Sequence, residues 1–295
     1  MKTPLFTGCA AALVTPFRKD GSCDEDAFVH LIQMQIDACM DAIVLLGTTG
    51  EASTLTMHER ERMISLGVKT VNKQMPVIVG TGANDTAKSI ELTQQAHSLG
   101  ADGCLCVTPY YNKTTQTGLI RHFTAIADST PLPILLYNVP TRTGMNIHPD
   151  TAKVLSEHHR VCGIKEASGD AGLSAEILHK TDNKLPMYAG NDDLILPLMA
   201  QGACGAISVI ANILPLQTRS ITTACLNGCY QEARSAHNAL FPLIKVLFSQ
   251  VNPIPIKAAL SSLGLIENIL RLPLIPMEEP YQSQLLALMK GMNLL

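Results

Sequence analysis

The stretch that decides the fold is 42-AIVLLGTTGE-51, in which five apolar residues lead into a loop of glycine, threonine and glutamate. The apolar run does not alternate with polar residues, which is typical of a strand covered on both faces. The same order of apolar run, loop and amphipathic stretch recurs along the first 210 residues. The eight runs are Ala10–Val14, Ala42–Leu46, Val77–Val79, Gly103–Val107, Ile134–Tyr137, Gly163–Ile164, Met187–Ala189 and Gly205–Val209.

The amphipathic stretches between these runs predict helices. Asp24–Ala38 carries apolar residues at helical spacing, and Thr86–Leu99 follows a capping residue, Asp85, and ends at Gly100. Eight strand–helix units in about 220 residues predict an α/β fold, a (β/α)8 TIM barrel. The alternative is a doubly wound sheet, but residues 80–85 (GTGAND), the nearest match to its GxGxxG fingerprint, lack the third glycine.

The strand pattern stops after about residue 212, and the segments that follow are helical in pattern. We therefore assign residues 1–225 to a barrel that carries the active site and residues 226–295 to a C-terminal helical tail. The tail is too apolar to stand free in water, so we expect it to pack on the barrel and to form part of a subunit contact. The predicted helices are 213–226, 229–249, 256–263 and 278–292.

The composition excludes several classes of protein. Lys and Arg total 22 against 25 Asp and Glu, a formal net charge of −3, which disfavours nucleic-acid and membrane-surface binding. No apolar run approaches the ~20 residues of a membrane-spanning helix. The nine cysteines include no CxxC pair, and the histidines show no ligand spacing. We therefore expect reduced thiols in a cytoplasmic protein, and no metal site.

Active sites of such barrels lie at the carboxyl ends of the strands, and one lysine stands there, Lys165 in Gly163–Ala167 (GIKEA). A lysine inside a barrel is costly unless it is paired, neutral or used covalently. Burial lowers the pKa of an amine, and a neutral amine condenses with a carbonyl to give a Schiff base. The alternative is a salt bridge to Glu166, although adjacent strand residues point to opposite faces.

Other strand ends carry groups that suit a small keto acid. The Tyr137 hydroxyl could move protons at a bound carbinolamine, or the ring could simply close the barrel top. The Thr48-Thr49 pair offers two hydroxyls and backbone N–H groups to a carboxylate, or forms an ordinary tight turn. Arg142 could clamp a second carboxylate, or could be a surface arginine.

Four ordered motifs resemble the dihydrodipicolinate synthase (4-hydroxy-tetrahydrodipicolinate synthase) family, within the pyruvate-imine, N-acetylneuraminate lyase-like class I aldolases. The resemblance continues through residues 188–192 (YAGND) to residues 252–257 (NPIPIK), so it covers the length of the chain. The four motifs are residues 47–51 (GTTGE), 108–113 (TPYYNK), 137–144 (YNVPTRTG) and 163–167 (GIKEA).

The resemblance implies a carbon–oxygen lyase that condenses pyruvate with L-aspartate 4-semialdehyde, toward lysine and diaminopimelate. It implies no organic cofactor and no catalytic metal, and a homotetramer built from two tight dimers. Lys165 would form the pyruvate imine. Tyr137 would relay protons, linked through Thr48 to Tyr111, which in the family reaches in from the neighbouring subunit.

The family pattern also implies the substrate contacts. Thr48 and Thr49 would hold the pyruvate carboxylate, and Arg142 would meet the carboxylate of the semialdehyde. Main-chain groups of Gly190 and Ile207 would line the pocket.

Two other functions are compatible with a barrel of this kind. N-acetylneuraminate lyases and 2-keto-3-deoxy-sugar-acid aldolases also use pyruvate imines, but there the first threonine is commonly serine and the arginine is lost. Thr48 and Arg142 therefore favour the synthase. A barrel that only binds a small molecule would be expected to lack the lysine or the tyrosine, and Lys165 and Tyr137 are both present.

Many members of the family are inhibited by lysine at a cleft between tightly paired subunits. Sensitive members typically have His at the positions of Met57 and Arg60, and Glu at that of Lys88. A cation ~4 Å from the incoming ammonium costs up to ~4 kcal/mol at an effective dielectric constant near 20. We therefore predict insensitivity to lysine, unless the two cations only form surface ion pairs with Glu61 or Glu91. The matching positions, a vestigial effector site, are Ala52, Ser53, Met57, Arg60, Asn84, Lys88 and Tyr110.

Overall fold

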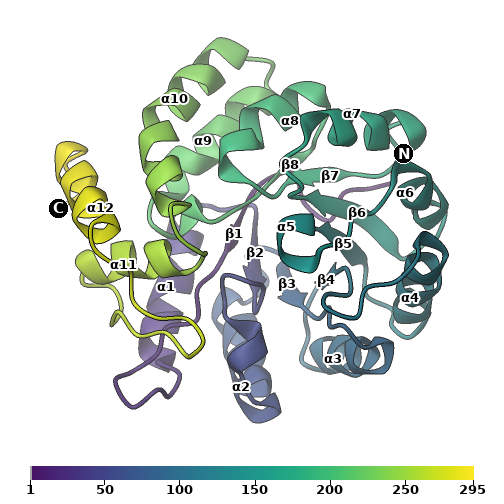
Figure 1. Cartoon of the computed structure of the whole chain (residues 1–295), viewed down its shortest axis with the longest axis horizontal. Helices are drawn as coiled ribbons and strands as arrows, with labels where there is room; N and C mark the ends of the chain where they lie inside the picture. The colour runs from purple at the N-terminus through teal and green to yellow at the C-terminus, as the bar shows by residue number, and fades with distance from the viewer. Residues whose placement is uncertain (1) are drawn as a thin grey trace.

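The computed structural model describes residues 2–295 and contains a closed barrel of eight parallel strands (Figure 1). The strands neighbour one another in chain order, and β8 pairs with β1 to close the barrel. This confirms the predicted (β/α)8 barrel and excludes the doubly wound sheet. The strands are β1 (Gly8–Ala12), β2 (Ala42–Leu45), β3 (Val77–Gly80), β4 (Gly103–Val107), β5 (Ile134–Asn138), β6 (Val161–Glu166), β7 (Met187–Ala189) and β8 (Gly205–Ser208).

A helix follows each strand and covers the outside of the barrel, and an additional short helix, α5, follows β5 (Figure 1). Short 3₁₀ turns η1 (Ala52–Thr54), η2 (Asp192–Leu194) and η3 (Ile210–Asn212) lie in the loops after β2, β7 and β8. The helices of the barrel are α1 (Glu25–Asp37), α2 (Met57–Val71), α3 (Thr86–Ser98), α4 (Gln116–Asp128), α5 (Pro140–Thr143), α6 (Pro149–Ser156), α7 (Ala171–Lys180), α8 (Ile195–Gln201) and α9 (Pro215–Leu226).

Side-chain caps explain where several of these helices begin. Asp24 accepts a hydrogen bond from the Ala27 N–H at the start of α1. Asp85, the predicted cap, accepts one from the Lys88 N–H at the start of α3. Thr56 and Glu59 form a capping box at the start of α2. Each cap satisfies a backbone donor that the first helical turn leaves unpaired.

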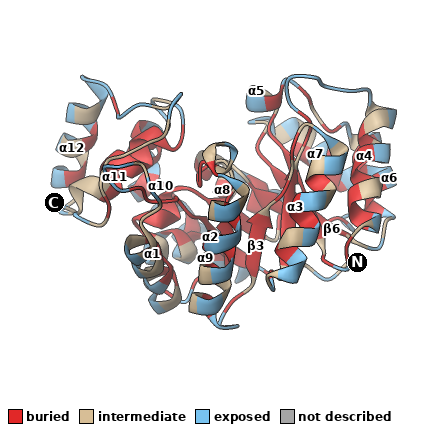
Figure 2. Ribbon diagram, turned by 90° about the horizontal axis from the view of Figure 1, so that it is seen from below, coloured by how far each residue is buried: buried red, intermediate tan, exposed pale blue. Residues whose placement is uncertain are grey.

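The barrel divides the core into two layers. The strands are buried throughout, whereas the helices bury one face and expose the other (Figure 2). Residues that point outward from the strands pack against the helices, and residues that point inward fill the barrel interior. This two-sided burial explains why the strand sequences lack polar alternation.

The first and sixth strands differ most from the predicted runs, whereas the other strands agree to within one residue at each end. The first strand ends at Ala12 rather than Val14, because the Val14 N–H donates to the Asn212 side chain at 3.1 Å instead of to a neighbouring strand. The sixth strand runs over Val161–Glu166 rather than Gly163–Ile164, because both its ends pair with β5. The pattern of apolar residues does not show whether a backbone N–H bonds to a side chain or to a neighbouring strand, so it does not fix where a strand ends.

The tail continues the core of the barrel on one side of the molecule, beside α9 and α1 (Figure 1). Buried leucines of α10 join the same hydrophobic cluster as the barrel helices. None of the helices within residues 2–295 combines the length and apolarity that a membrane crossing needs. The tail helices, α10 (Tyr230–Leu247), α11 (Ile254–Ser262) and α12 (Tyr281–Gly291), lie within one to three residues of the predicted boundaries.

Candidate active site

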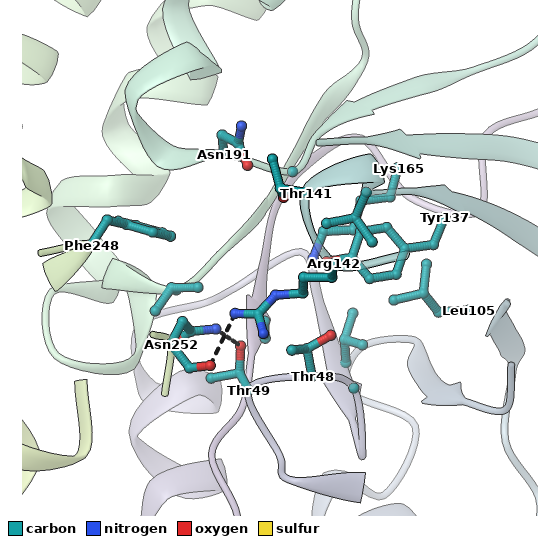
Figure 3. A pocket seen from close by; sticks show the side chains of 16 residues that line it. Thr48, Thr49, Leu105, Tyr137, Thr141, Arg142, Lys165, Asn191, Phe248 and Asn252 are labelled. Atoms are coloured by element: carbon teal, nitrogen blue, oxygen red, sulfur yellow. Dashed lines mark hydrogen bonds between the residues drawn. The ribbon is translucent and has the colours of Figure 1, made fainter. Parts of the chain in front are cut away.

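A cavity of about 140 Å³ lies at the carboxyl ends of the strands (Figure 3). It brings together side chains that are far apart in the sequence: Thr48 and Thr49 after β2, Tyr137 on β5, and Lys165 on β6. This is the end of the barrel at which the catalytic groups of such folds meet. The structure therefore brings these four predicted residues to one place. Other residues that line the cavity include Arg142, Gly190, Phe248 and Asn252.

Lys165 lies in the barrel interior, where only 6% of the residue is exposed. It stands beside Tyr137 in the β5–β6 register, and its Nζ lies 4.6 Å from the centroid of the Tyr137 ring. Within residues 2–295 no carboxylate forms an ion pair with this amine. Lys165 therefore faces the cavity with the Tyr137 ring against its amine and with no ion-pair partner within residues 2–295.

Glu166 points away from Lys165, as strand alternation predicts. Its Oε2 accepts a hydrogen bond from Asn138 Nδ2 at 2.8 Å, and its Oε1 accepts one from the Ser168 N–H. Burial raises the pKa of the Glu166 carboxyl above its usual range, and the hydrogen bonds from Ser168 and Asn138 oppose that shift. The salt-bridge alternative for Lys165 is therefore wrong.

Asp192 is a second buried carboxylate near the cavity. Its Oδ2 accepts hydrogen bonds from the N–H groups of Val209 and Ile210, at 3.0 and 2.9 Å. Burial raises the pKa of this carboxyl as well, while the positive charge of Lys165 is among the influences that lower it. Asp192 thus fixes the loop after β8, from which Val209 contributes to the cavity wall.

The two predicted anion-binding groups lie side by side. Thr49 is buried, and its Oγ1 accepts a hydrogen bond from Asn252 Nδ2 at 2.9 Å. Arg142, on α5, donates from Nη2 to the backbone oxygen of Asn252 at 3.0 Å. Figure 3 shows the Arg142 guanidinium beside Thr49 and Asn252. The guanidinium therefore reaches the cavity wall, although the arginine as a whole is exposed.

Gly190 lines the cavity, but Ile207 does not. A Cβ at position 190 would lie 3.0 Å from Lys165 Cε and 2.7 Å from the Ala167 Cβ, so glycine permits a close approach to the lysine. Ile207 fills the barrel interior on β8, and Val209 occupies the wall after that strand.

Tyr111 lies outside the cavity of its own chain. The residue is 92% exposed, and its backbone has a positive φ of 67°. No hydrogen bond connects Thr48, Tyr137 and Tyr111 within the described part of the chain. One chain therefore does not by itself assemble the proton relay that the family resemblance implies.

The predicted effector positions gather around a second cavity of about 690 Å³, which shares Thr48, Tyr137 and Arg142 with the first. Asn84 is not among its lining residues, and its backbone oxygen accepts a hydrogen bond from Asn112 Nδ2. The effector positions that line the cavity are Ala52, Ser53, Met57, Arg60, Lys88 and Tyr110.

The two cations of this cavity have different environments. Lys88 forms an ion pair with Glu91, Nζ to Oε2 at 2.9 Å, as the alternative interpretation held. Arg60 is buried instead, and its Nη2 donates to the Gly80 backbone oxygen at 2.8 Å. Burial lowers the pKa of Arg60 to about 10, so the guanidinium still carries its charge at neutral pH.

Sequence reasoning missed two sets of residues that shape the site. Phe248 and Asn252 come from the tail, which was expected only to pack and to contact a subunit. Glu51 and Lys257 form an ion pair at 2.6 Å in which neither side chain is exposed. The stretch 252–257 was part of the family resemblance, and this was the one available signal for the positions of Asn252 and Lys257.

The comparisons with known proteins agree with this site. The model of the dihydrodipicolinate synthetase family matches residues 5–292. The chain belongs to this family. A relative from Alkaliphilus oremlandii, named 4-hydroxy-tetrahydrodipicolinate synthase, is 48% identical over 99% of this chain and 100% of its own. A second, from Exiguobacterium sp., bears the same name and is 46% identical over 98% of this chain and 99% of its own.

Solved structures of the family have the same fold. Dihydrodipicolinate synthase from Thermotoga maritima superposes with a TM-score of 0.96 at 41% identity, over 99% of this chain and 100% of that one. The enzyme from Cyanidioschyzon merolae, solved with lysine bound, has a TM-score of 0.95 at 36% identity, over 99% and 100% of the two chains. The cavity at the strand ends is therefore the place to seek the family's chemistry.

Proposed function

We propose that this chain is a 4-hydroxy-tetrahydrodipicolinate synthase, which condenses pyruvate with L-aspartate 4-semialdehyde. The observation that carries the proposal is the placement of Lys165, buried at the barrel mouth beside Tyr137 and without a carboxylate partner within residues 2–295. A lysine amine that has lost its proton can attack the ketone carbon of pyruvate and expel water to form an imine. The protonated imine nitrogen then withdraws electrons from the methyl group.

The chemistry of the later steps follows from this imine. Loss of a methyl proton gives an enamine, whose carbon attacks the aldehyde carbon of the semialdehyde. The α-amino group of the semialdehyde then attacks the imine carbon, closes the ring and releases Lys165 as an amine. Tyr137, whose ring lies against Lys165, is the group placed to move protons in these steps.

Two substrate carboxylates require two anion sites. We assign the pyruvate carboxylate to Thr48 and Thr49 and that of the semialdehyde to Arg142, because these side chains line one cavity with Lys165. We assign Tyr111 to the cavity of a neighbouring subunit, because it is exposed and remote from its own. The active form would then be a tetramer of two tight dimers. We place this enzyme in the cytoplasm. Residues 226–295 would form the tail region of each subunit.

A comparison of substrates distinguishes the synthase from the other enzymes that form a pyruvate imine. The purified protein should consume pyruvate with L-aspartate 4-semialdehyde and should show a far lower kcat/KM for cleavage of N-acetylneuraminate or a 2-keto-3-deoxy-sugar acid. The Arg142→Ala variant should lose activity mainly through the KM of the semialdehyde. A higher kcat/KM for a sugar acid would assign the chain to the aldolases instead.

We further propose that lysine does not regulate this enzyme. The second cavity presents Arg60 and Lys88 where a lysine ammonium would have to enter, and burial prevents Arg60 from turning into solvent. Its guanidinium opposes a second cation in the cavity. Initial rates should be unchanged by millimolar L-lysine. Half-inhibition below 1 mM would contradict the proposal and would show that the Lys88–Glu91 pair screens the charge.

A further inference from the structure

Asn252 is hydrogen-bonded to two of the predicted anion-binding residues, Thr49 and Arg142. It lies in the turn between α10 and α11, outside the barrel, and is 8% exposed. Its side-chain Nδ2 donates to Thr49 Oγ1 at 2.9 Å, while its backbone oxygen accepts from Arg142 Nη2 at 3.0 Å. Figure 3 shows both hydrogen bonds at the edge of the cavity.

The contact with Thr49 determines what that hydroxyl can offer a ligand. A hydroxyl has one proton to donate and two lone pairs that accept. Because the Asn252 amide donates to one lone pair of Thr49, the hydroxyl proton is free to turn toward the cavity. A free donor at this place would bind a carboxylate, whereas an accepting neighbour would draw the proton away from it.

The side chain of Asn252 has a single protein partner within residues 2–295. Asn252 Oδ1 is buried and has no hydrogen-bond partner within residues 2–295. An unpaired buried carbonyl oxygen is unfavourable, and such groups call for an explanation in function. With the amide N–H directed to Thr49, the only side-chain hydrogen bond of Asn252 within residues 2–295 is therefore the one to Thr49.

The turn that carries Asn252 is anchored on its α11 side by Lys257. The buried ion pair between Lys257 of α11 and Glu51 joins the start of that helix to the loop that contains Thr49. Lys257 also donates to the Thr15 backbone oxygen at 2.9 Å. The distance between Asn252 and Thr49 is therefore held by fixed elements rather than by a mobile surface loop.

We propose that Asn252 is a positioning residue through which the tail orients Thr49 and Arg142, and thereby sets the affinity of the site for both substrate carboxylates. The inference rests on the proposed function, because it assigns carboxylates to those two side chains. It gives the tail a part in substrate binding in addition to its packing on the barrel.

Two substitutions of Asn252, to alanine and to aspartate, test the inference. If the residue only fills space, the aspartate variant should bind pyruvate better than the alanine variant, whereas if it acts as a donor the aspartate variant should bind pyruvate worse. Asn252→Ala removes the donor to Thr49 and should raise the pyruvate KM ~5-fold, the effect of one neutral hydrogen bond, with kcat nearly unchanged. Asn252→Asp keeps the shape but can only accept, and it adds a negative charge. Its pyruvate KM should therefore exceed that of the alanine variant, by less at acidic pH than at neutral pH.

Gln250→Ala is the matched control. Gln250 lies two residues earlier in the same turn, but its Nε2 donates to Glu278 Oε2 at the exposed outer side, at 2.9 Å. This variant disturbs the turn without reaching the cavity, so both KM values should remain those of the unmodified protein. A rise in KM equal to that of Asn252→Ala would show that the turn, and not the amide, is responsible.

The inference is wrong if the alanine variant keeps the pyruvate KM, or if the aspartate variant binds pyruvate better than the alanine variant does. If the aspartate variant does not fold, the pyruvate KM of the alanine variant alone tests the inference. Borohydride trapping of pyruvate separates this failure from failure of the proposed function. Trapping on Lys165 with unchanged KM values removes only the role of Asn252, whereas absence of trapping in the unmodified protein removes the proposed function.

Discussion

Lys165 and Glu166 are neighbours in the chain but belong to different environments. The lysine faces the cavity beside the Tyr137 ring, and the glutamate is hydrogen-bonded to Asn138 and Ser168. Strand alternation predicts this separation from the sequence, because successive side chains of a strand point to opposite faces. The contact of Thr49 with Asn252 could not be predicted from such local rules, because 203 residues separate the two.

The Tyr137 hydroxyl carries the first prediction at this scale. Tyr137→Phe removes the proton-transfer group next to Lys165 and should lower kcat by ~10²–10⁴-fold, the usual contribution of a positioned acid–base group. Steady-state rates with both substrates measure this. Tyr188→Phe is the control, because the Tyr188 hydroxyl bonds to the Phe6 backbone inside the barrel, donating to its oxygen and accepting from its N–H, and does not line the cavity. A Tyr137 variant as active as this control would remove the residue from the mechanism.

Gly190 leads to a second prediction. In Gly190→Ala the new Cβ would lie 2.9 Å from the Glu166 backbone oxygen and 3.0 Å from Lys165 Cε. Either the end of β6 or the Lys165 side chain must therefore move. Overpacking of this kind costs ~1–3 kcal/mol of unfolding free energy, and here it should also lower kcat. Chemical unfolding and initial rates measure the two effects. Gly291→Ala, in α12, where a Cβ meets nothing within 4 Å, should lower neither quantity; equal losses at both positions would refute the crowding argument.

At the scale of elements, the loops after the strands are held by long-range contacts. Glu51, which ends the loop after β2, pairs with Lys257 of α11, and Lys257 Nζ lies 4.2 Å from the centroid of the Phe17 ring. Helix starts were predictable, because caps such as Asp24 and Asp85 act within four residues of the chain. The partner of Glu51 was not predictable, because charge pairing across 206 residues leaves no local pattern.

The Glu51–Lys257 pair yields a stability prediction. Lys257→Met leaves the Glu51 carboxylate buried without its partner, and the loss of one member of a buried pair costs ~3–5 kcal/mol. The double variant Glu51→Gln/Lys257→Met leaves no buried charge and should be less destabilised than Lys257→Met alone. Urea unfolding of the three proteins measures the difference. A double variant that is less stable than the single one would contradict this account.

Arg271 joins the segment after α11 to α2, and this contact predicts an effect of pH. Hydrogen bonds from Arg271 lower the pKa of Glu59 from 4.5 to about 2, so folding favours the ionised carboxylate. The stabilisation is therefore complete above pH 4.5 and is lost as pH falls toward 2.

Glu59→Gln should accordingly lower the midpoint of thermal unfolding at neutral pH. The difference in midpoint between this variant and the unmodified protein should shrink as the pH falls from 4.5 toward 2. Glu61→Gln is the control, because Glu61 is exposed on the same helix and forms no ion pair within residues 2–295. A Glu59 difference that stays constant from pH 7 to pH 3 would argue against the pKa shift as its cause.

At the scale of the whole molecule, the barrel was predictable because eight repeats of one pattern leave few alternatives. The positions of Lys165, Tyr137 and Thr48 at one barrel mouth follow from that topology, since parallel strands end together. Two features lie beyond it. The tail reaches back to the cavity through Asn252, and Tyr111 stays outside its own cavity, so a single chain does not contain every proposed group.

The most direct test of the central claim is the site of imine formation. The protein is treated with pyruvate and borohydride, which reduces an imine to a stable amine, and its intact mass and peptides are then measured. The account predicts one pyruvyl adduct, on Lys165, and none on Lys257, whose amine is ion-paired to Glu51. An adduct on another lysine, or no adduct on the folded protein, would contradict it.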